Sequence, residues 1–210
     1  DVYINGGYVY AYSALGTAIG GGSSKTNVGG DAYVTITGGQ IIAKSGSGAG
    51  IGGGSAYTVG DEKDTNYNGG TANVKISGNP IIRTGSIGGG NTSAKNGKIG
   101  SASVNISGGD IQAQFVMAAG AKETPEFTMS GGIIRNSYVD DEEYIHIKKQ
   151  GGAVYLEDGT FTMSGGTIKN CSAEQGGAVY VNSQSGNSTF TMTGGEIHSC
   201  FATGGEIDDI

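Results

Sequence analysis

Apolar residues recur at fixed distances from a short phrase that appears seven times: an apolar residue, a small polar residue and a Gly pair (Gly-Asn in the third copy). Apolar side chains stand four before, two before and three after the first Gly, separated mostly by polar residues. This alternation with a period of two predicts half-buried strands rather than helices. The three columns are Val2, Val34, Val74, Val104, Phe127, Phe161 and Phe190; Ile4, Ile36, Ile76, Ile106, Met129, Met163 and Met192; and Val9, Ile41, Ile81, Ile111, Ile134, Ile168 and Ile197.

The spacing of the phrases indicates a stacked repeat. From first Gly to first Gly the steps are 32, 40, 30, 23, 34 and 29 residues, so the smallest unit has about 23 residues and longer steps contain insertions. Further apolar pieces, one in each unit, include Ile19, Ile51, Ile87 and residues 117–120, 151–156 and 176–181. We predict an all-β fold, a single-stranded parallel β-helix of about seven rungs with three short strands each, over one domain, residues 1–210. Each Gly pair would form a corner between two strands, because Gly tolerates positive φ.

Composition narrows the classes of partner. Gly supplies 43 of the 210 residues and Pro only 2, and 19 acidic against 12 basic residues give a net charge of −7. The acidic balance argues against nucleic-acid binding and against attraction to an anionic membrane surface. No apolar run approaches the length of a membrane span. We therefore expect no nucleic-acid partner and no membrane insertion. Because a strand-like run follows Asp1 directly, the chain reads as an excised or mature fragment.

Two insertions interrupt the columns, residues 54–72 and residues 138–150. Both mix Tyr with carboxylates, and loops on a rigid scaffold often carry binding residues, although a solvated loop also explains them. In the second insertion, Asp140 and Asp141 are candidate binding residues. The carboxylates at 140–143 are where Ca²⁺ would bind if the chain holds it; otherwise we expect no cofactor. Neither end has an evident cap, so we expect flanking sequence or end-to-end self-association through open strand edges.

Phrases in the second half resemble a known repeat. Residues 167–170 (TIKN) precede GGAVY at 176–180, and residues 133–136 (IIRN) precede GGAVY at 151–155. This arrangement resembles the repeat of chlamydial polymorphic outer-membrane proteins, which carries F-x-x-N and G-G-A-I phrases. Residues 48–54 (GAGIGGG) look like Gly-rich β-helix repeats of large surface proteins from gut Firmicutes. The resemblance implies a right-handed parallel β-helix in a secreted or surface-anchored bacterial protein, and hence an extracellular location. It implies little about activity, since adhesins, lyases and hydrolases share this fold.

Cys171 and Cys200 both stand six residues after the first Gly of their phrase, so they should lie on adjacent rungs. A spacing of about 4.8 Å between rungs is within the range for a disulfide, but in-register side chains point the same way and leave the Cβ atoms slightly too far apart. A disulfide and a stack of reduced thiols both stay open, whereas a metal site lacks further His or Cys ligands. Asn136 and Asn170 share the column just before, where we expect an internal amide ladder.

Two sets of outward residues are candidates for binding. Four after the first Gly stand Tyr10, Ile42, Ile82, Gln112, Arg135, Lys169 and His198. The last three of these form a basic stripe, which matches an acidic glycan or else is a solvated face. Tyr3, Tyr8 and Tyr10 point outward by alternation, where their rings either stack on sugars or pack under a cap at the N-terminal end.

These features favour binding over catalysis, and no catalytic residue stands out. We expect an adhesin-like module that presents a rigid surface to a glycan or to a host or bacterial surface protein. Two alternatives remain open: a carbohydrate-active β-helix enzyme, either a polysaccharide lyase or a glycoside hydrolase, and a purely structural stalk. A carboxylate pair, or a carboxylate with a basic residue in one cleft, would favour the enzyme.

Overall fold

The protein is all-β in the part of the chain that the computed structural model describes, residues 1–25, 28–46, 48–57, 67–94, 96–118, 125–135, 150–183 and 188–204. Within these residues there are strands, turns and bends but no helix. Fourteen strands belong to one sheet, two more form a small separate sheet, and every pairing between named strands is parallel. The absence of helix follows from the period-two pattern, which offers no apolar stripe at helical spacing.

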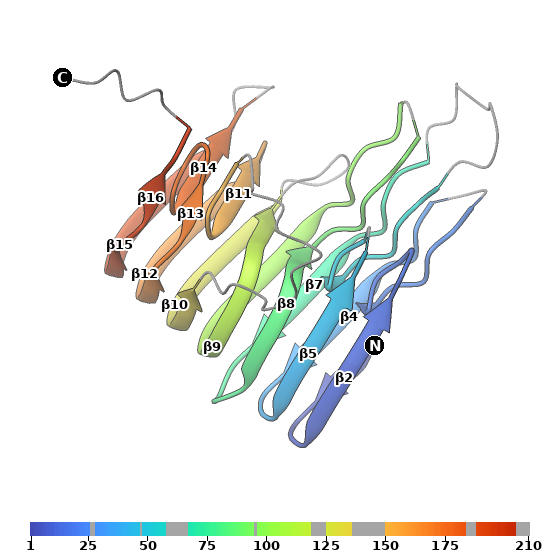
Figure 1. The fold of residues 1–210 in the computed structure, drawn as a ribbon, viewed down its shortest axis with the longest axis horizontal. Helices are drawn as coiled ribbons and strands as arrows, with labels where there is room; N and C mark the ends of the chain where they lie inside the picture. The colour runs from blue at the N-terminus through green and yellow to red at the C-terminus, as the bar shows by residue number, and fades with distance from the viewer. Residues whose placement is uncertain are drawn as a thin grey trace.

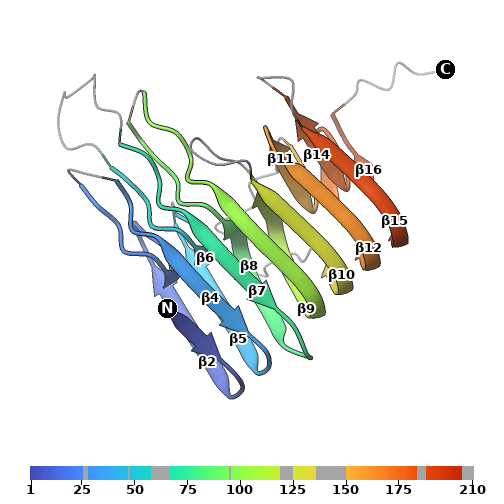
Figure 2. The ribbon, with the colours of Figure 1, turned by 180° about the vertical axis from the view of Figure 1, so that it is seen from behind.

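The first row of strands contains one member from each of the seven repeats, side by side as Figure 2 shows. In spatial order they are β1 (Val2–Ile4), β4 (Ala32–Ile36), β7 (Ala72–Ile76), β9 (Ala102–Ala118), β10 (Glu126–Arg135), β12 (Thr160–Lys169) and β15 (Thr189–His198). The register confirms the first two apolar columns, from Val2 to Phe190 and from Ile4 to Met192, in every neighbouring pair. In this part of the first row, each repeat therefore lies in register with the next.

A second row follows after the Gly corner. It contains β2 (Tyr8–Ser13), β5 (Gln40–Ser45), the start of β8 (Ile81–Gly88) and later parts of β9, β10, β12 and β15. Third pieces pair in the same way: β3 (Ile19–Gly20), β6 (Ile51–Gly52), the ends of β8 and β9, β11 (Val154–Glu157) and β14 (Val179–Asn182). The small sheet pairs β13 (Ser172–Ala173) with β16 (Phe201–Ala202).

The second Gly of the phrase makes the corner in six repeats, where its φ lies between 79° and 94°. In the third repeat, Gly78-Asn79-Pro80 replaces the Gly pair, and Gly78 itself has a φ of 68°. This turn is one residue longer than the others, since Ile82 and not Ile81 pairs with Ile41 and Ile111.

The longer turn makes two of our assignments wrong. Ile81, expected in the interior, is 43% exposed, whereas Ile82, expected outside, is fully buried. Arg83 takes the outward place that Ile82 was given, between Ile42 and Gln112. One further position shifts in the fourth repeat, where Val116 rather than Met117 continues the column of Ile87.

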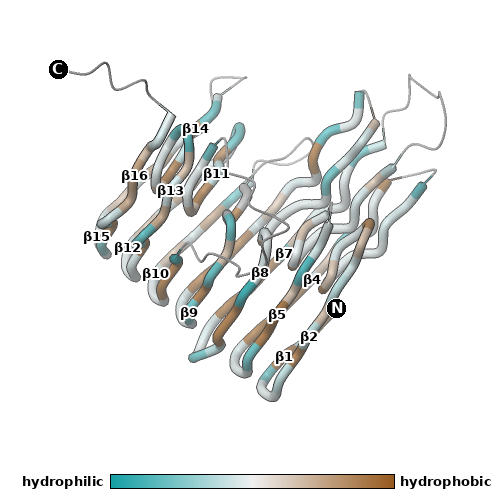
Figure 3. Tube along the Cα trace, viewed as in Figure 1, coloured by the Kyte–Doolittle hydropathy of each residue, from teal (hydrophilic) through white to brown (hydrophobic). Residues whose placement is uncertain are grey.

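The columns meet in one continuous interior. Phe127 and Phe161 are fully buried, and the ring of Phe161 stacks on that of Phe127 at 4.4 Å between centroids and on that of Phe190 at 4.7 Å. Val34, Val74 and Val104 fill the equivalent places in earlier repeats with at most 1% exposure. Figure 3 shows the apolar positions as brown bands at matching places on successive strands. The interior prediction is thus confirmed for the middle of the columns, whereas Met192 at the C-terminal end is 42% exposed and Ile81 lies outside.

Three repeats of the first half carry a feature that the sequence did not lead us to expect, which we name the glycine arms. The outgoing arms are residues 20–25, 52–57 and 88–93, and the returning arms are residues 28–31, 67–71 and 97–101. They extend beyond the strands at the upper right of Figure 1.

Backbone hydrogen bonds between glycines join the arms in alternation. The N–H of Gly30 donates to the carbonyl of Gly22 at 2.8 Å, that of Gly54 to Gly30 at 2.8 Å, and that of Gly70 to Gly54 at 2.8 Å. The series continues from Gly90 to Gly70 and from Gly100 to Gly90, both at 2.9 Å. A Cβ at Gly54 would lie on the carbonyl of Gly22, so only Gly permits this approach.

Our description of residues 54–72 as a loop is wrong at both ends of the segment, which belong to the glycine arms. Ser55 and Ala56 are fully buried, and Gly69 and Gly70 are buried too, so both flanks of the insertion are packed. Residues 58–66 lie outside the described residues, as do Asp140, Asp141, Asn136 and all of the second insertion except Gln150. A second correction concerns the amide ladder, because Asn170 is exposed at a corner with a φ of 53°.

Candidate ligand-binding groove

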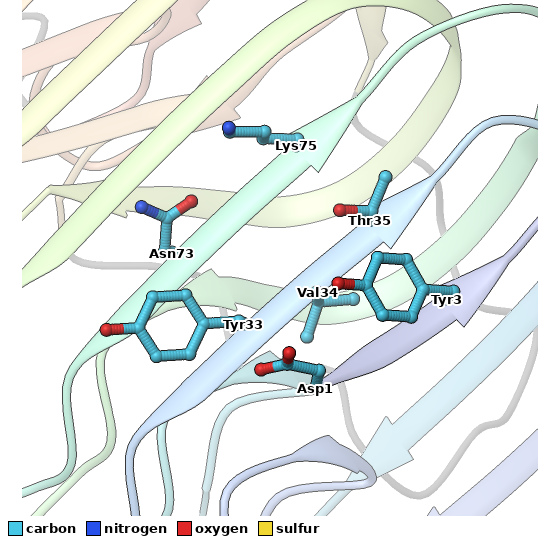
Figure 4. Close-up of a pocket in the computed structure, with 7 residues that line it drawn as sticks. All are labelled: Asp1, Tyr3, Tyr33, Val34, Thr35, Asn73 and Lys75. Atoms are coloured by element: carbon cyan, nitrogen blue, oxygen red, sulfur yellow. The ribbon is translucent and has the colours of Figure 1, made fainter.

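A groove lies on the outward side of the first strand row, near its N-terminal end. Its volume is about 320 Å³, and its lining comes from β1, β4 and β7. The lining residues are Asp1, Tyr3, Tyr33, Val34, Thr35, Asn73 and Lys75 (Figure 4). Because the side chains of a strand alternate, burial of the Val2, Val34 and Val74 column directs the residues on either side of it outward.

In-register pairing brings these side chains together. Tyr3, Thr35 and Lys75 are direct neighbours on three successive strands, and Tyr33 pairs with Asn73. Figure 4 shows the Tyr3 ring beside Thr35 and the Tyr33 ring farther along the strand that carries Thr35, with Asn73 and Lys75 on the next strand. Tyr3 and Tyr33 are both exposed, at 69% and 60%.

The polar side chains of the groove are available to a ligand. No side-chain hydrogen bond or ion pair joins Asp1, Tyr3, Tyr33, Asn73 or Lys75 to any residue in the described ranges. The groove therefore offers two aromatic faces, a carboxylate, an amide and an ammonium group with their hydrogen-bonding capacity unused. Tyr rings with polar neighbours can take the apolar face and the hydroxyl groups of a sugar together.

Sequence reasoning found Tyr3 but missed Tyr33, Asn73 and Lys75 as partners. A signal was present, since Tyr33 stands one before Val34, on the outward side of the same column. The predicted residues Tyr8 and Tyr10 do not enter this groove. They lie on β2 with Tyr12, all more than half exposed, in the second strand row.

The basic stripe is in register, with one change of membership. Tyr10, Ile42, Arg83, Gln112, Arg135, Lys169 and His198 pair in this order on seven successive strands. The structure thus brings Tyr10, Arg135, Lys169 and His198 into one column. Arg83 joins them because of the longer turn at Pro80.

One acidic partner was not anticipated. Arg135 Nε donates to Asp110 Oδ1 at 2.7 Å and Nη2 donates to Oδ2 at 2.8 Å. The hydrogen bond to Asp110 raises the pKa of the Arg135 guanidinium above its ordinary value. The pair is a basic residue beside a carboxylate, but it lies on the second strand row and not in the groove, so it does not supply the clustered cleft that would favour an enzyme.

Cys171 and Cys200 are free thiols, and the neighbouring pair Ser172 and Phe201 places them on adjacent strands. Each S–H donates to a carbonyl two residues earlier, Cys171 to Lys169 and Cys200 to His198, both at 3.2 Å. The sequence left open a disulfide or a stack of reduced thiols, and in the structure the two thiols are reduced.

A third face carries stacked tyrosines that the sequence did not single out. Tyr155 and Tyr180 stack with centroids 5.7 Å apart, and Tyr155 donates to Glu157 Oε2 at 3.2 Å. Burial raises the pKa of the Tyr155 hydroxyl above its ordinary value. Because the ring stacking and the hydrogen bond both lie within the protein, this pair stabilises the sheet.

Comparison with family models, with curated proteins and with solved structures finds no match to this chain. In the described part of the chain there is no helix long and apolar enough to cross a membrane. Nor do three or more His, Cys, Asp or Glu side chains gather there in a way that would hold a metal ion.

Proposed function

We propose that this chain is a right-handed parallel β-helix module of a bacterial extracellular surface protein, and that it binds a glycan in the groove between Tyr3 and Tyr33. The coiled path is supported by parallel pairing of every repeat with the next in the first two strand rows, and of the first six repeats in the third row. The handedness is supported by the strong general preference for right-handed crossovers between parallel strands.

The observation that carries the binding proposal is the pair of open Tyr rings beside polar side chains with no internal partner. In soluble proteins, exposed aromatic rings grouped with unused polar groups mark ligand sites more often than single exposed apolar residues do. The groove sits on a hydrogen-bonded sheet, so its side chains are held in place before the ligand arrives.

A glycan fits this groove better than a protein partner does. Stable protein interfaces cover about 800 Å² on each partner around an apolar centre, whereas a groove of about 320 Å³ with only seven lining residues is small. Its volume lies at the lower end of small-molecule sites, roughly 300–1,000 Å³. A short stretch of a neutral or amino sugar chain matches the two rings with Asp1 and Asn73.

The test is a glycan array with the whole chain and with Tyr33→Ala. Loss of a stacking Tyr should weaken binding about tenfold or more. Tyr12→Ala is the matched control, since Tyr12 is an equally exposed Tyr outside the groove. Equal loss in both variants would contradict the groove as the site.

The same glycans, incubated with the protein and analysed for new reducing or unsaturated ends, test the enzyme alternative. Detection of cleavage products would support a carbohydrate-active enzyme and contradict the assignment as a binding module. If no glycan binds and none is cleaved, the proposal fails and the structural stalk remains.

A further inference from the structure

We propose a second ligand site on another face, in which the column from Tyr10 to His198 binds an acidic glycan that lies along the long axis of the strand stack. This site goes beyond the groove, because it belongs to the second strand row and would take a ligand of different charge. The observation that supports this site is the set of cationic groups that the strand register places in one column.

The geometry of the column suits a linear ligand. Arg83, Gln112, Arg135, Lys169 and His198 occupy equivalent places on five successive strands. At about 4.8 Å per strand, they span roughly 19 Å. Arg83 and His198 are exposed, and Arg135 and Lys169 are half-buried.

Such a column costs stability when it is empty. Like charges that face each other on neighbouring strands destabilise a sheet. This chain has only 12 Lys and Arg residues against 19 Asp and Glu, yet three of these cations stand in one column. A ligand with negative charges along its length would remove the repulsion.

Internal carboxylates compensate only part of the charge. Asp110 pairs with Arg135 through two hydrogen bonds, and the carbonyl of Gln112 accepts from the same guanidinium. Arg83 and Lys169 form no ion pair with any residue in the described ranges. Glu196, exposed two residues before His198, is a further carboxylate on this side of the strands.

The two unpaired cations determine the chemistry that would bind. An Arg guanidinium can hold a carboxylate or a sulfate with two parallel hydrogen bonds, and a Lys ammonium attracts either as a point charge. At the N-terminal end of the column, Tyr10 is 57% exposed and offers an aromatic face to a sugar ring. An acidic polysaccharide combines both features.

A nucleic acid is the other linear polyanion, and the charge balance disfavours it. The chain carries a net charge of −7, and nucleic-acid binding depends on a broad basic surface that displaces counterions. One cationic column with Asp110 and Glu196 beside it is narrower than that.

The experiment measures binding of the whole chain to hyaluronate, dextran sulfate, neutral dextran and a single-stranded oligonucleotide at low salt. We expect one or both acidic polysaccharides to bind, and the preferred one to identify the acidic group as carboxylate or sulfate. Neutral dextran should not bind. Equal binding of neutral dextran, or tighter binding of the oligonucleotide, would overturn the proposal.

Variants then locate the site. Arg83→Ala and Lys169→Ala should each weaken binding about threefold to fivefold, and together roughly tenfold or more, as expected for partly exposed charge contacts that act on one ligand. Lys169→Arg should retain most of the binding.

Lys98→Ala removes the same charge from an exposed position on a returning glycine arm, away from the column. It should change binding less than twofold. If Lys98→Ala weakens binding as much as Lys169→Ala, the attraction is non-specific and no site exists. Circular dichroism of each variant checks that the strands remain intact.

Discussion

The first three repeats and the last three solve the same packing problem in different ways. In the first three, the column in the first strand row consists of Val, and the repeats widen into glycine arms. In the last three the same column consists of stacked Phe rings, with Met in place of Ile two residues later. The fourth repeat, with the minimal step of 23 residues after its Gly, lies at the junction.

The difference shows that one register can be kept with two kinds of contact. Aromatic and Met side chains bury much apolar area per residue and need only short connections. The glycine arms bury only small side chains such as Ser55 and Ala56 and depend on close backbone approach. Glycine N–H groups of one arm reach carbonyls of the neighbouring arm at 2.8–2.9 Å. Side-chain truncation should therefore damage the last repeats most, and an added methyl group the first repeats.

The largest expected effect is in the Phe column. Phe161→Ala removes a fully buried ring that stacks on both neighbours, and it should lower the free energy of unfolding by about 3–5 kcal/mol. Urea unfolding followed by circular dichroism measures the loss.

Phe190→Ala, in the last strand of the row, is the comparison. Phe190 is only partly buried and has a ring neighbour on one side, so its loss should be clearly smaller. If both variants lose the same stability, the rings do not act as a continuous stack.

The next effect tests the longer turn of the third repeat. Ile82→Ala empties a fully buried place and should cost about 2–5 kcal/mol. Ile81→Ala removes a side chain that is 43% exposed, and should cost within about 0.5 kcal/mol, as surface changes do. A larger loss of stability for Ile81→Ala than for Ile82→Ala, in thermal or urea unfolding, would contradict the longer turn. It would instead support the register that counting from Gly78 predicts.

Much of the strand arrangement could be predicted because its signals are local and repeated. Alternation with a period of two identifies strands, and the Gly pair identifies corners, without knowledge of distant residues. The error at Ile81 came from the one phrase in which Asn79-Pro80 stands in place of the second Gly. Whether a turn keeps its length when its residues change depends on how the next strand pairs, which one copy of the pattern does not reveal.

The glycine arms and the groove were harder to predict for a related reason. Gly triplets at 20–22, 52–54 and 88–90 were visible, but their partners on the returning arms lie at variable distances along the chain. In the same way, Tyr33 and Lys75 become neighbours of Tyr3 only through pairing across steps of 32 and 40 residues. Arg135, Lys169 and His198 could be predicted as one column because they share one offset from the phrase, whereas Arg83 has a different offset and joins them only through the longer turn.

A smaller effect addresses the arms directly. Gly54→Ala places a methyl group on the carbonyl of Gly22, and crowding of this kind should cost about 1–3 kcal/mol. Amide hydrogen exchange at Gly30 and Gly70 should become faster, since the N–H of Gly30 donates to the crowded carbonyl of Gly22 and the N–H of Gly70 donates to the carbonyl of Gly54.

Gly22→Ala provides the matched control in the same series of hydrogen bonds. A Cβ at Gly22 meets nothing within 4 Å, so this variant should be neutral or slightly more stable, because Ala restricts the unfolded chain. Equal damage from both substitutions would mean that arm stability does not depend on the close backbone contact.

The smallest expected effect concerns the polar contact between the fourth and fifth repeats, where the two arrangements meet. Asp110→Asn removes the ion pair with Arg135. The side chain of Arg135 is 37% exposed and that of Asp110 is 34% exposed. Solvent screens such a pair, so the loss of unfolding free energy should be within about 1 kcal/mol.

The control is Glu126→Gln. Glu126 is an exposed carboxylate on the adjacent strand, and its replacement removes the same charge without breaking a pair. Urea unfolding at low salt should separate the two variants. In about 1 M salt, where the screening length falls to roughly 3 Å, they should converge. A difference that persists at high salt would assign Asp110 a structural role at the junction through its hydrogen bonds rather than its charge.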